Sequence, residues 1–232
     1  MFGKNLCRAI STGASRLLRA LLVMAVVTVG VFGVGGCDPG SVDQSLTDIT
    51  TAPVVTAKDR RLAGVYSPLD GVWVGEFRIF ASPDGQSVGP ARPREIAGVT
   101  IATPPLRALQ TIRVRQEYVS DSPYFQRVTI RDTYSDAKGE RTVESRGVNK
   151  IQNGRLWCVV KKPNETVIHQ GSAPSPGVII WERDQRSPLK IEYFHETVRA
   201  NAYTIRGWGY YGKDDPEKAP RLWFLGEYKR IP

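Results

Sequence analysis

Cysteine and histidine are scarce in this sequence, which argues against several kinds of site. Three cysteines and two histidines occur in 232 residues, too few for a disulfide framework or for the clustered ligands of a zinc site. Strand alternation puts Glu192 and Glu196 on the face opposite His195, so these three do not converge on a metal. His169 lies beside an expected turn, and we expect it in solvent. No nucleophile motif or phosphate-binding glycine loop is present, so we expect no metal and no hydrolase.

A block of positive charge is also missing. The net charge is +9, but Lys4, Arg8, Arg16 and Arg19 precede the first acidic residue, and the chain after residue 36 carries only +5. These later charges are mixed in sign along the sequence, whereas a protein that binds the phosphates of a nucleic acid has a block of basic residues. We therefore expect no nucleic-acid partner. The single long uncharged run, 20–36, lies directly after the four basic residues.

This arrangement of a basic start and an apolar run is typical of a signal sequence. Its end, Val34-Gly35-Gly36-Cys37, resembles the lipobox of bacterial lipoproteins, which implies cleavage before Cys37 and lipidation of that residue. An uncleaved anchor helix is the alternative, since 17 to 20 apolar residues can just cross a bilayer, at about 1.5 Å per residue. Either way, we expect a domain anchored to a membrane of the cell envelope, facing the periplasm or the exterior. Residues 1–36 would be the signal peptide.

Residues 37–67 are rich in Ser, Thr, Asp, Pro and Val without a sustained period, which predicts a flexible tether. From 68 to 232 we expect one domain. Short runs of β-branched and aromatic residues alternate there with turn residues, and the pattern predicts no convincing amphipathic helix. Segment 89–108 is interrupted by prolines and is expected to be a long loop. Strands are predicted at 72–80, 110–119, 124–134, 140–150, 155–161, 165–170, 177–183, 189–198, 201–211 and 221–230.

The breaks between these strands have hairpin chemistry, such as Asn153-Gly154, which suits a type I′ turn. Sequential strands with hairpin links predict an all-β, antiparallel up-and-down barrel of about 8–10 strands, because closure removes unpaired edges. A two-sheet sandwich is the alternative. Alternation places three sets of side chains each on one face of a strand. These sets are Trp73, Phe77 and Ile79; Ile112, Val114 and Tyr118; and Leu222, Phe224 and Tyr228.

The start of the first strand, Gly71-Val72-Trp73, resembles the Gly-x-Trp signature of lipocalins and the wider calycin group. In that group the Trp closes the floor of the barrel, and a basic residue of the last strand packs on its ring. Lys229 and Arg230 stand where the partner is expected. The resemblance implies that Gly71, Trp73 and Arg230 close the barrel.

A second resemblance is to the CpcT/CpeT chromophore lyase family. It lies in Gln116-Glu117-Tyr118, in 122–128 with Ser-Pro-Tyr-Phe-Gln-Arg-Val, in Cys158-Val159-Val160-Lys161-Lys162, and in the closing segment 223–230. That family folds as a calycin barrel and attaches linear tetrapyrroles (bilins) to protein cysteines. The sequence departs from the family at Arg115, where the family has Glu, and at Phe125, where it has Arg.

Three functions stay open at this point. The first is a non-enzymatic barrel that binds an apolar or tetrapyrrole-like molecule, with Tyr118, Tyr124, Arg127 and Tyr193 as ligand-binding residues. The second is a bilin lyase, and the third is an interaction module with a filled barrel. Cys158 lies in an apolar strand and is expected to be a buried small side chain, with a reactive thiol as the alternative.

Overall fold

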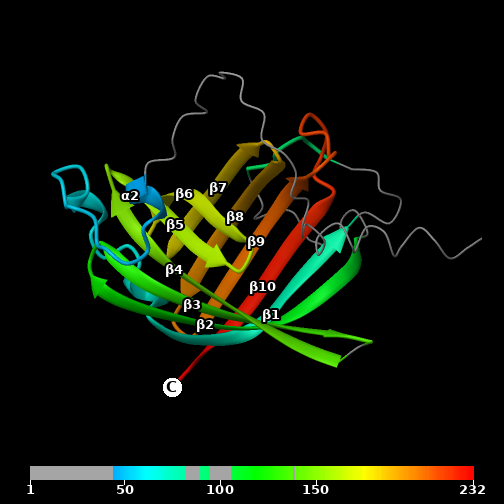
Figure 1. Ribbon diagram of the computed structural model, residues 1–232, viewed down its shortest axis with the longest axis horizontal. Helices are drawn as coiled ribbons and strands as arrows, with labels where there is room; N and C mark the ends of the chain where they lie inside the picture. The colour runs from blue at the N-terminus through cyan, green and yellow to red at the C-terminus, as the bar shows by residue number, and fades with distance from the viewer. Residues whose placement is uncertain (1–43, 82–88, 95–105, 138) are drawn as a thin grey trace, which may run out of the picture. The chain divides into compact units, whose positions relative to one another are not determined.

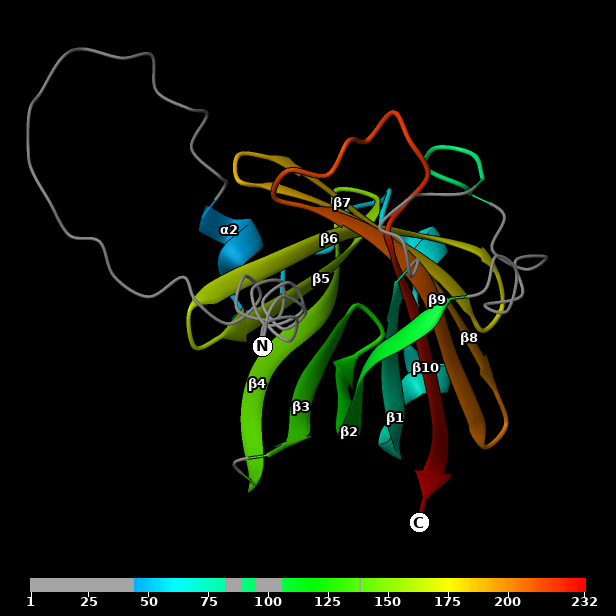
Figure 2. The same ribbon diagram turned by 90° about the vertical axis from the view of Figure 1, so that its right-hand side faces the viewer.

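The computed structural model describes residues 44–81, 89–94, 106–137 and 139–232. Ten antiparallel strands form one closed barrel, in which each strand pairs with its neighbours in sequence and β1 also pairs with β10 (Figures 1 and 2). The strands are β1 (Gly71–Ala81), β2 (Arg107–Ser122), β3 (Phe125–Asp136), β4 (Gly139–Gln152), β5 (Arg155–Lys162), β6 (Glu165–Ser175), β7 (Val178–Arg186), β8 (Leu189–Arg199), β9 (Ala202–Tyr211) and β10 (Leu222–Ile231).

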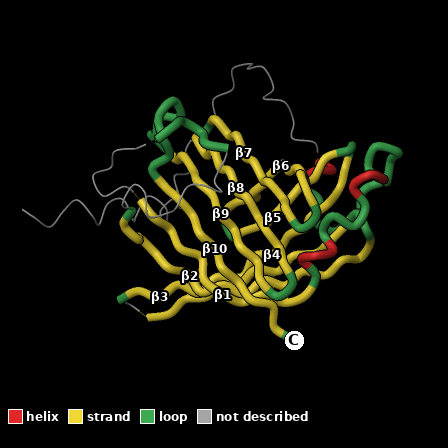
Figure 3. The backbone as a smooth tube through the Cα atoms, turned by 180° about the vertical axis from the view of Figure 1, so that it is seen from behind, coloured by secondary structure: helices red, strands yellow, loops and turns green. Residues whose placement is uncertain are grey.

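The predicted fold class is confirmed, and the closed pairing rules out the sandwich. The described helical elements are short: α2 (Gln44–Thr47), η1 (Arg60–Leu62) and η2 (Ser67–Leu69), drawn in red on the tube of Figure 3. Cys37 and the predicted export segment lie outside the described residues. Within those residues, no helix has the length and apolar character needed to cross a bilayer.

The hairpin between β4 and β5 shows how local chemistry sets the strand order. Asn153 and Gly154 have φ angles of 57° and 73°, the left-handed values that a type I′ turn needs at both central positions. The two-residue loop holds β4 and β5 in tight antiparallel register, with Gln152 opposite Arg155. The turn prediction is confirmed.

The floor of the barrel lies at the start of β1. Trp73 is completely buried there, and its indole Nε1 donates to the Leu69 carbonyl at 2.6 Å. Arg230 faces Trp73 across the β1–β10 pair, with its guanidinium carbon 4.5 Å from the centre of the indole ring. The same guanidinium donates to the Asp70 and Pro68 carbonyls. Segment 68–70 is thereby tied across this end of the barrel.

Residues 44–67, predicted as a tether, pack against the barrel instead. The ammonium of the buried Lys150 donates to the Ser45 and Asp48 carbonyls at 2.6 and 2.8 Å. Ile49 packs on a small apolar cluster on the outer face of the barrel, formed by Phe125, Val148 and Val159. Composition alone missed these contacts because they join single residues to outward-facing strand positions and leave no period in the sequence.

Asp59 fixes the same segment to the barrel. One carboxylate oxygen accepts the Gly154 amide at 2.6 Å, and the other accepts the amide and hydroxyl of Thr56. Burial acts to raise the pKa of Asp59, but these hydrogen bonds outweigh it and the pKa is lowered. The carboxylate therefore stays charged and joins the Thr56 turn to the β4–β5 hairpin.

Candidate ligand-binding lumen

Strand register determines which side chains face the inside of the barrel. Trp73 pairs with Gln116 on one side and with Arg230 on the other, and alternate positions along each strand share its face. The inward set therefore includes Phe77 on β1 and Ile130 on β3. Several members of the set keep part of their surface accessible although strands surround them: Phe77, Ile79, Ile130, Tyr134, Cys158, Phe194 and Glu196. Water can therefore reach part of the lumenal wall.

Inward-facing glycines make room for the large side chains of the lumen. A Cβ atom at Gly171 would lie 2.5 Å from the Trp181 ring, and one at Gly207 would lie 2.6 Å from Phe194. Both distances are far below van der Waals contact, so each ring occupies the space that a side chain at the glycine would need. The glycines thereby let these rings pack close to the barrel wall.

Rings cover much of the lumenal wall in its middle section. The centroids of Phe77 and Phe224 are 5.7 Å apart, those of Phe224 and Phe194 5.5 Å, and those of Phe194 and His169 5.5 Å. Such spacings are typical of stacked and edge-to-face aromatic pairs. The wall is therefore suited to apolar and planar surfaces.

A charged network lies at one side of the lumen, toward the end opposite the floor. His169 Nε2 is 2.9 Å from Glu192, and Tyr211 donates to the second oxygen of Glu192 at 2.6 Å. Arg183, 8 % exposed, lies 3.6 Å from Glu192. Burial raises the pKa of Glu192, but the hydrogen bond and charge of His169, together with Tyr211 and Arg183, lower it to about 2. This acid is charged and already paired.

Glu165 extends the network at the end of the barrel. Its carboxylate accepts hydrogen bonds from Arg183 at 2.5 Å and from Lys190 at 2.6 Å. Burial opposes the charge, but the bonds from Lys190 and Arg183 lower the pKa of Glu165 overall. Both acids of the network therefore have cationic partners within the protein.

Glu196 has a different environment, deeper in the lumen. Burial raises its pKa to about 7, although side-chain hydrogen bonds with Trp181 and Tyr203 act in the opposite direction. Across the part of the chain that the structure describes, no ion pair reaches Glu196. Its electrostatic neighbours are neutral groups with raised pKa values: Tyr66, Tyr118, Cys158, Tyr203 and Tyr228.

Cys158 faces the lumen and is half-buried. The pKa of its thiol is raised to about 12, mainly by burial and secondly by the nearby carboxylate of Glu196. Since the thiolate is the reactive form of cysteine, this thiol is a poor nucleophile. The geometry supports the interpretation of Cys158 as a small wall residue.

The four residues predicted to bind a ligand fall in three places. Tyr118 faces inward near the floor, where its hydroxyl donates to Gln116 at 2.8 Å and lies 3.5 Å from that of Tyr203. Tyr124 packs half-buried against the same core. Arg127 faces outward, with its side chain 62 % exposed and paired with Asp121, and Tyr193 also faces outward. Arg127 and Tyr193 thus lie outside the lumen.

Tyr193 belongs to an aromatic cluster on the outer surface of β8, β9 and β10. It stacks on Trp208 at 5.5 Å between ring centroids, and Ile191, Tyr210 and Trp223 complete the cluster. Two loop carbonyls accept hydrogen bonds from the cluster. The Arg94 carbonyl accepts the Tyr193 hydroxyl, and the Pro93 carbonyl accepts the indole N–H of Trp208. Segment 91–94 therefore covers this cluster, which acts as a second core outside the barrel.

Sequence reasoning missed Glu196, Glu192 and His169 as lumen residues. His169 was expected in solvent, but it lies within β6, opposite Cys158, and its side chain is 12 % exposed. The signal for both glutamates was present, because they share the alternate positions of β8 with Phe194. Strand alternation alone does not show which face of β8 points into the barrel.

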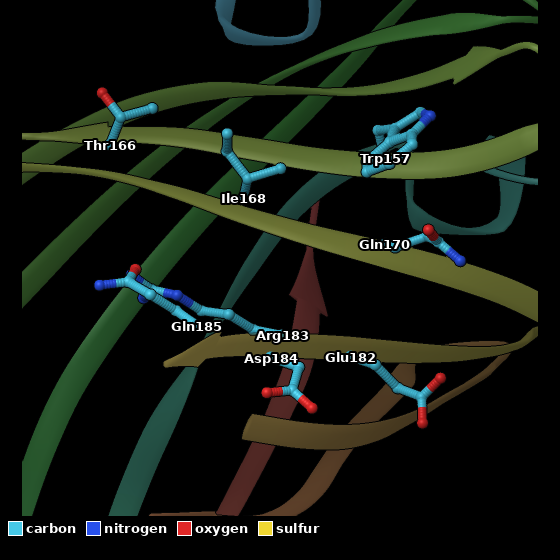
Figure 4. Close-up of a pocket in the computed structure, with 8 residues that line it drawn as sticks. All are labelled: Trp157, Thr166, Ile168, Gln170, Glu182, Arg183, Asp184 and Gln185. Carbon is cyan, nitrogen blue, oxygen red and sulfur yellow. The ribbon is translucent and has the colours of Figure 1, made fainter. Parts of the chain in front are cut away.

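A second concavity lies on the outside of the wall, over β5, β6 and β7 (Figure 4). It measures about 270 Å³, and its lining is mixed polar and charged: Trp157, Thr166, Ile168, Gln170, Glu182, Arg183, Asp184 and Gln185. Ligand pockets are typically enclosed and mainly apolar, so this shallow, polar hollow is a weaker candidate than the lumen. No group of three potential metal ligands occurs among the residues described.

No protein-family model matches the chain, and no curated protein matches it. Among solved structures, a redesigned beta barrel matches at a TM-score of 0.33 and 12 % identity, over 74 % of this chain and 98 % of that chain. The barrel assignment itself stands on the strand pairing given above.

Proposed function

We propose that the barrel binds a small, largely apolar molecule in its lumen, with flat aromatic compounds such as tetrapyrroles among the candidates. The observation that carries the proposal is the partial exposure of inward-facing apolar side chains, Phe77, Ile130 and Phe194 above all. An apolar wall with a few oriented polar groups is the usual composition of a small-molecule site. A closed floor at Trp73 gives the site a bottom.

The two alternatives have less support. A filled barrel, which an interaction module would have, is disfavoured by the accessible surface inside the wall. For the bilin lyase, Arg127 is the basic residue that the resemblance matches, and it faces outward with most of its side chain exposed. Phe125 stands where the family has the other Arg. We therefore do not extend the proposal to catalysis.

The test uses the fluorescent probe N-phenyl-1-naphthylamine, which brightens in apolar surroundings. We expect saturable enhancement with the protein, and displacement by biliverdin or haem if tetrapyrroles belong to the ligand class. Ile130→Trp, which places a bulky ring in the lumen, should weaken probe binding at least tenfold. Arg131→Trp, one residue along β3 and exposed, is the control and should leave binding unchanged.

Two results would count against lumen binding. One is the absence of probe binding to protein whose circular dichroism shows a folded barrel. The other is an equal loss of binding in the two tryptophan variants, which would place the probe on the surface. Melting curves of both variants separate a filled lumen from an unfolded protein.

We also propose that the protein is a lipid-anchored component of the cell envelope. The support is the lipobox-like segment that ends at Cys37, and two or three acyl chains, at about 0.8 kcal/mol per buried methylene, hold a domain at a membrane stably. Mass spectrometry of the mature N-terminus should find a modified Cys37, and Cys37→Ser should release the domain from the membrane fraction. An intact N-terminus on a membrane-bound protein would favour the uncleaved anchor helix instead.

A further inference from the structure

The deep lumen contains an acid without a cationic partner, in contrast to the acids nearer the open end. Glu192 is paired with His169 and Arg183, and Glu165 with Arg183 and Lys190. Glu196 projects from β8 into the same lumen, and in the described segments its hydrogen-bond partners are two donors, the side chains of Trp181 and Tyr203. Two neutral donors orient a carboxylate but do not neutralise it.

The rings around Glu196 are uncharged, and two charged side chains, Asp132 on β3 and Lys162 on β5, act on the same neighbours, Tyr228 and Cys158. Tyr203 lies on the neighbouring strand β9, with its ring 5.2 Å from Tyr228 and 6.4 Å from Tyr118, and Trp181 lies on β7. Ring faces attract cations, most strongly where water is excluded. A carboxylate that faces the lumen among such rings attracts positive charge.

We propose that the natural ligand carries a basic nitrogen, and that its ammonium group pairs with Glu196 while its apolar part lies along the wall of Phe77, Phe194 and Phe224. This inference rests on the proposed lumen binding and adds the ligand class to it. A carboxylate ligand would meet repulsion at this depth. A neutral ligand would leave the charge of Glu196 uncompensated, so Glu196 would take up a proton when such a ligand binds.

Glu196 also makes the pairing depend on pH near neutrality. The neutral groups that face it are Tyr66 beside the floor, Tyr118 on β2, Cys158 on β5, Tyr203 on β9 and Tyr228 on β10, all with raised pKa values and uncharged at pH 6 to 8. Two ionisable groups act on the same neighbours: Lys162 on Cys158, and Asp132, whose pKa burial raises, on Tyr228. With a pKa of about 7, Glu196 is about nine-tenths ionised at pH 8 and about one-tenth at pH 6. An alkylammonium keeps its charge over this range, so amine affinity should fall about tenfold from pH 8 to pH 6.

The experiment displaces N-phenyl-1-naphthylamine from the full chain with three compounds of one chain length: decylamine, decanol and decanoate. At pH 8 we expect decylamine to bind at least tenfold more tightly than decanol, and decanoate to bind most weakly. Glu196→Gln keeps the shape and the acceptor oxygen but removes the charge. It should bring decylamine and decanol within about twofold of each other and remove the pH dependence.

Glu76→Gln is the matched control, because Glu76 is exposed on the outer face of β1, and it should behave as the wild type. If Glu196→Gln does not fold, the pH dependence of decylamine binding to the wild type still decides the matter. Affinity that is flat from pH 6 to pH 8 would overturn the inference.

The outcomes separate the inference from the proposed function. If the probe binds but decylamine, decanol and decanoate displace it equally, the lumen binds apolar molecules and the proposed preference for amines is wrong. If decanoate binds best, the head group is held by the basic residues of the charged network, and the preference is again wrong. If the probe does not bind at all, lumen binding itself fails.

Discussion

Arg230→Met is the substitution that most directly tests the closed floor. The guanidinium donates to the Asp70 carbonyl at 2.5 Å and to the Pro68 carbonyl at 2.7 Å, and it lies over the Trp73 ring. A hydrogen bond to a charged group contributes about 1.5 to 3 kcal/mol, and a cation–π contact about 0.5 to 2 kcal/mol. Because Arg230 is only partly buried and the contacts are not independent, we expect the free energy of unfolding to fall by about 2 to 4 kcal/mol.

Urea denaturation followed by tryptophan fluorescence measures this loss. Lys229→Met is the matched control, since Lys229 is the exposed neighbour on β10, and it should change stability by less than about 0.5 kcal/mol. Arg230→Lys should recover only part of the loss, because one ammonium cannot span both carbonyls in the fixed geometry of a guanidinium. Equal effects of the Arg230→Met and Lys229→Met substitutions, or a loss below about 1 kcal/mol for Arg230→Met, would refute the role assigned to the guanidinium.

Three further predictions concern single groups. Gly171→Ala puts a Cβ atom 2.5 Å from the Trp181 ring and should destabilise the barrel by about 1 to 3 kcal/mol; an unchanged melting temperature would show that the ring moves aside freely. Asp59→Asn should cost about 1 to 3 kcal/mol at pH 7. Because the pKa of Asp59 is lowered from 3.8 in the folded state, its stabilisation is present above that value and is lost as the pH falls through the folded pKa, so urea curves of the two proteins should converge in acid. Cys158, whose thiol has a pKa of about 12, should react with a disulfide reagent at pH 8 only slowly until urea exposes it, and rapid reaction of the folded protein would contradict this.

The strand order could be read from the sequence because its signals are local. Period-two runs and turn pairs such as Asn153-Gly154 lie within a few residues of each other, and all ten predicted strands occur within a few residues of their predicted ends. The prediction that Trp73, Phe77 and Ile79 share one face of β1 is also confirmed, because strand alternation holds over these positions.

The candidate site was harder to predict because it depends on contacts between distant strands. β8 carries aromatic residues on both faces, Phe194 inside and Tyr193 outside, so hydrophobicity alone could not separate the lumen from the outer aromatic cluster. Arg127 was predicted to orient a ligand inside the barrel because a buried Arg needs an acceptor partner, whereas register puts it on the face opposite Val128. The tether was misjudged for a related reason, since Asp59 and Lys150 act through single long-range hydrogen bonds.

The seam between β1 and β10 has a consequence for how the protein is made. It joins groups as far apart as Asp70 and Arg230, 160 residues along the chain, and contacts between such distant residues slow folding because a long loop must close first. While the chain folds, β1 lacks one of its two partners until Leu222–Ile231 joins the sheet. Before that pairing forms, the sheet is open and exposes unpaired edges, which can pair with other chains.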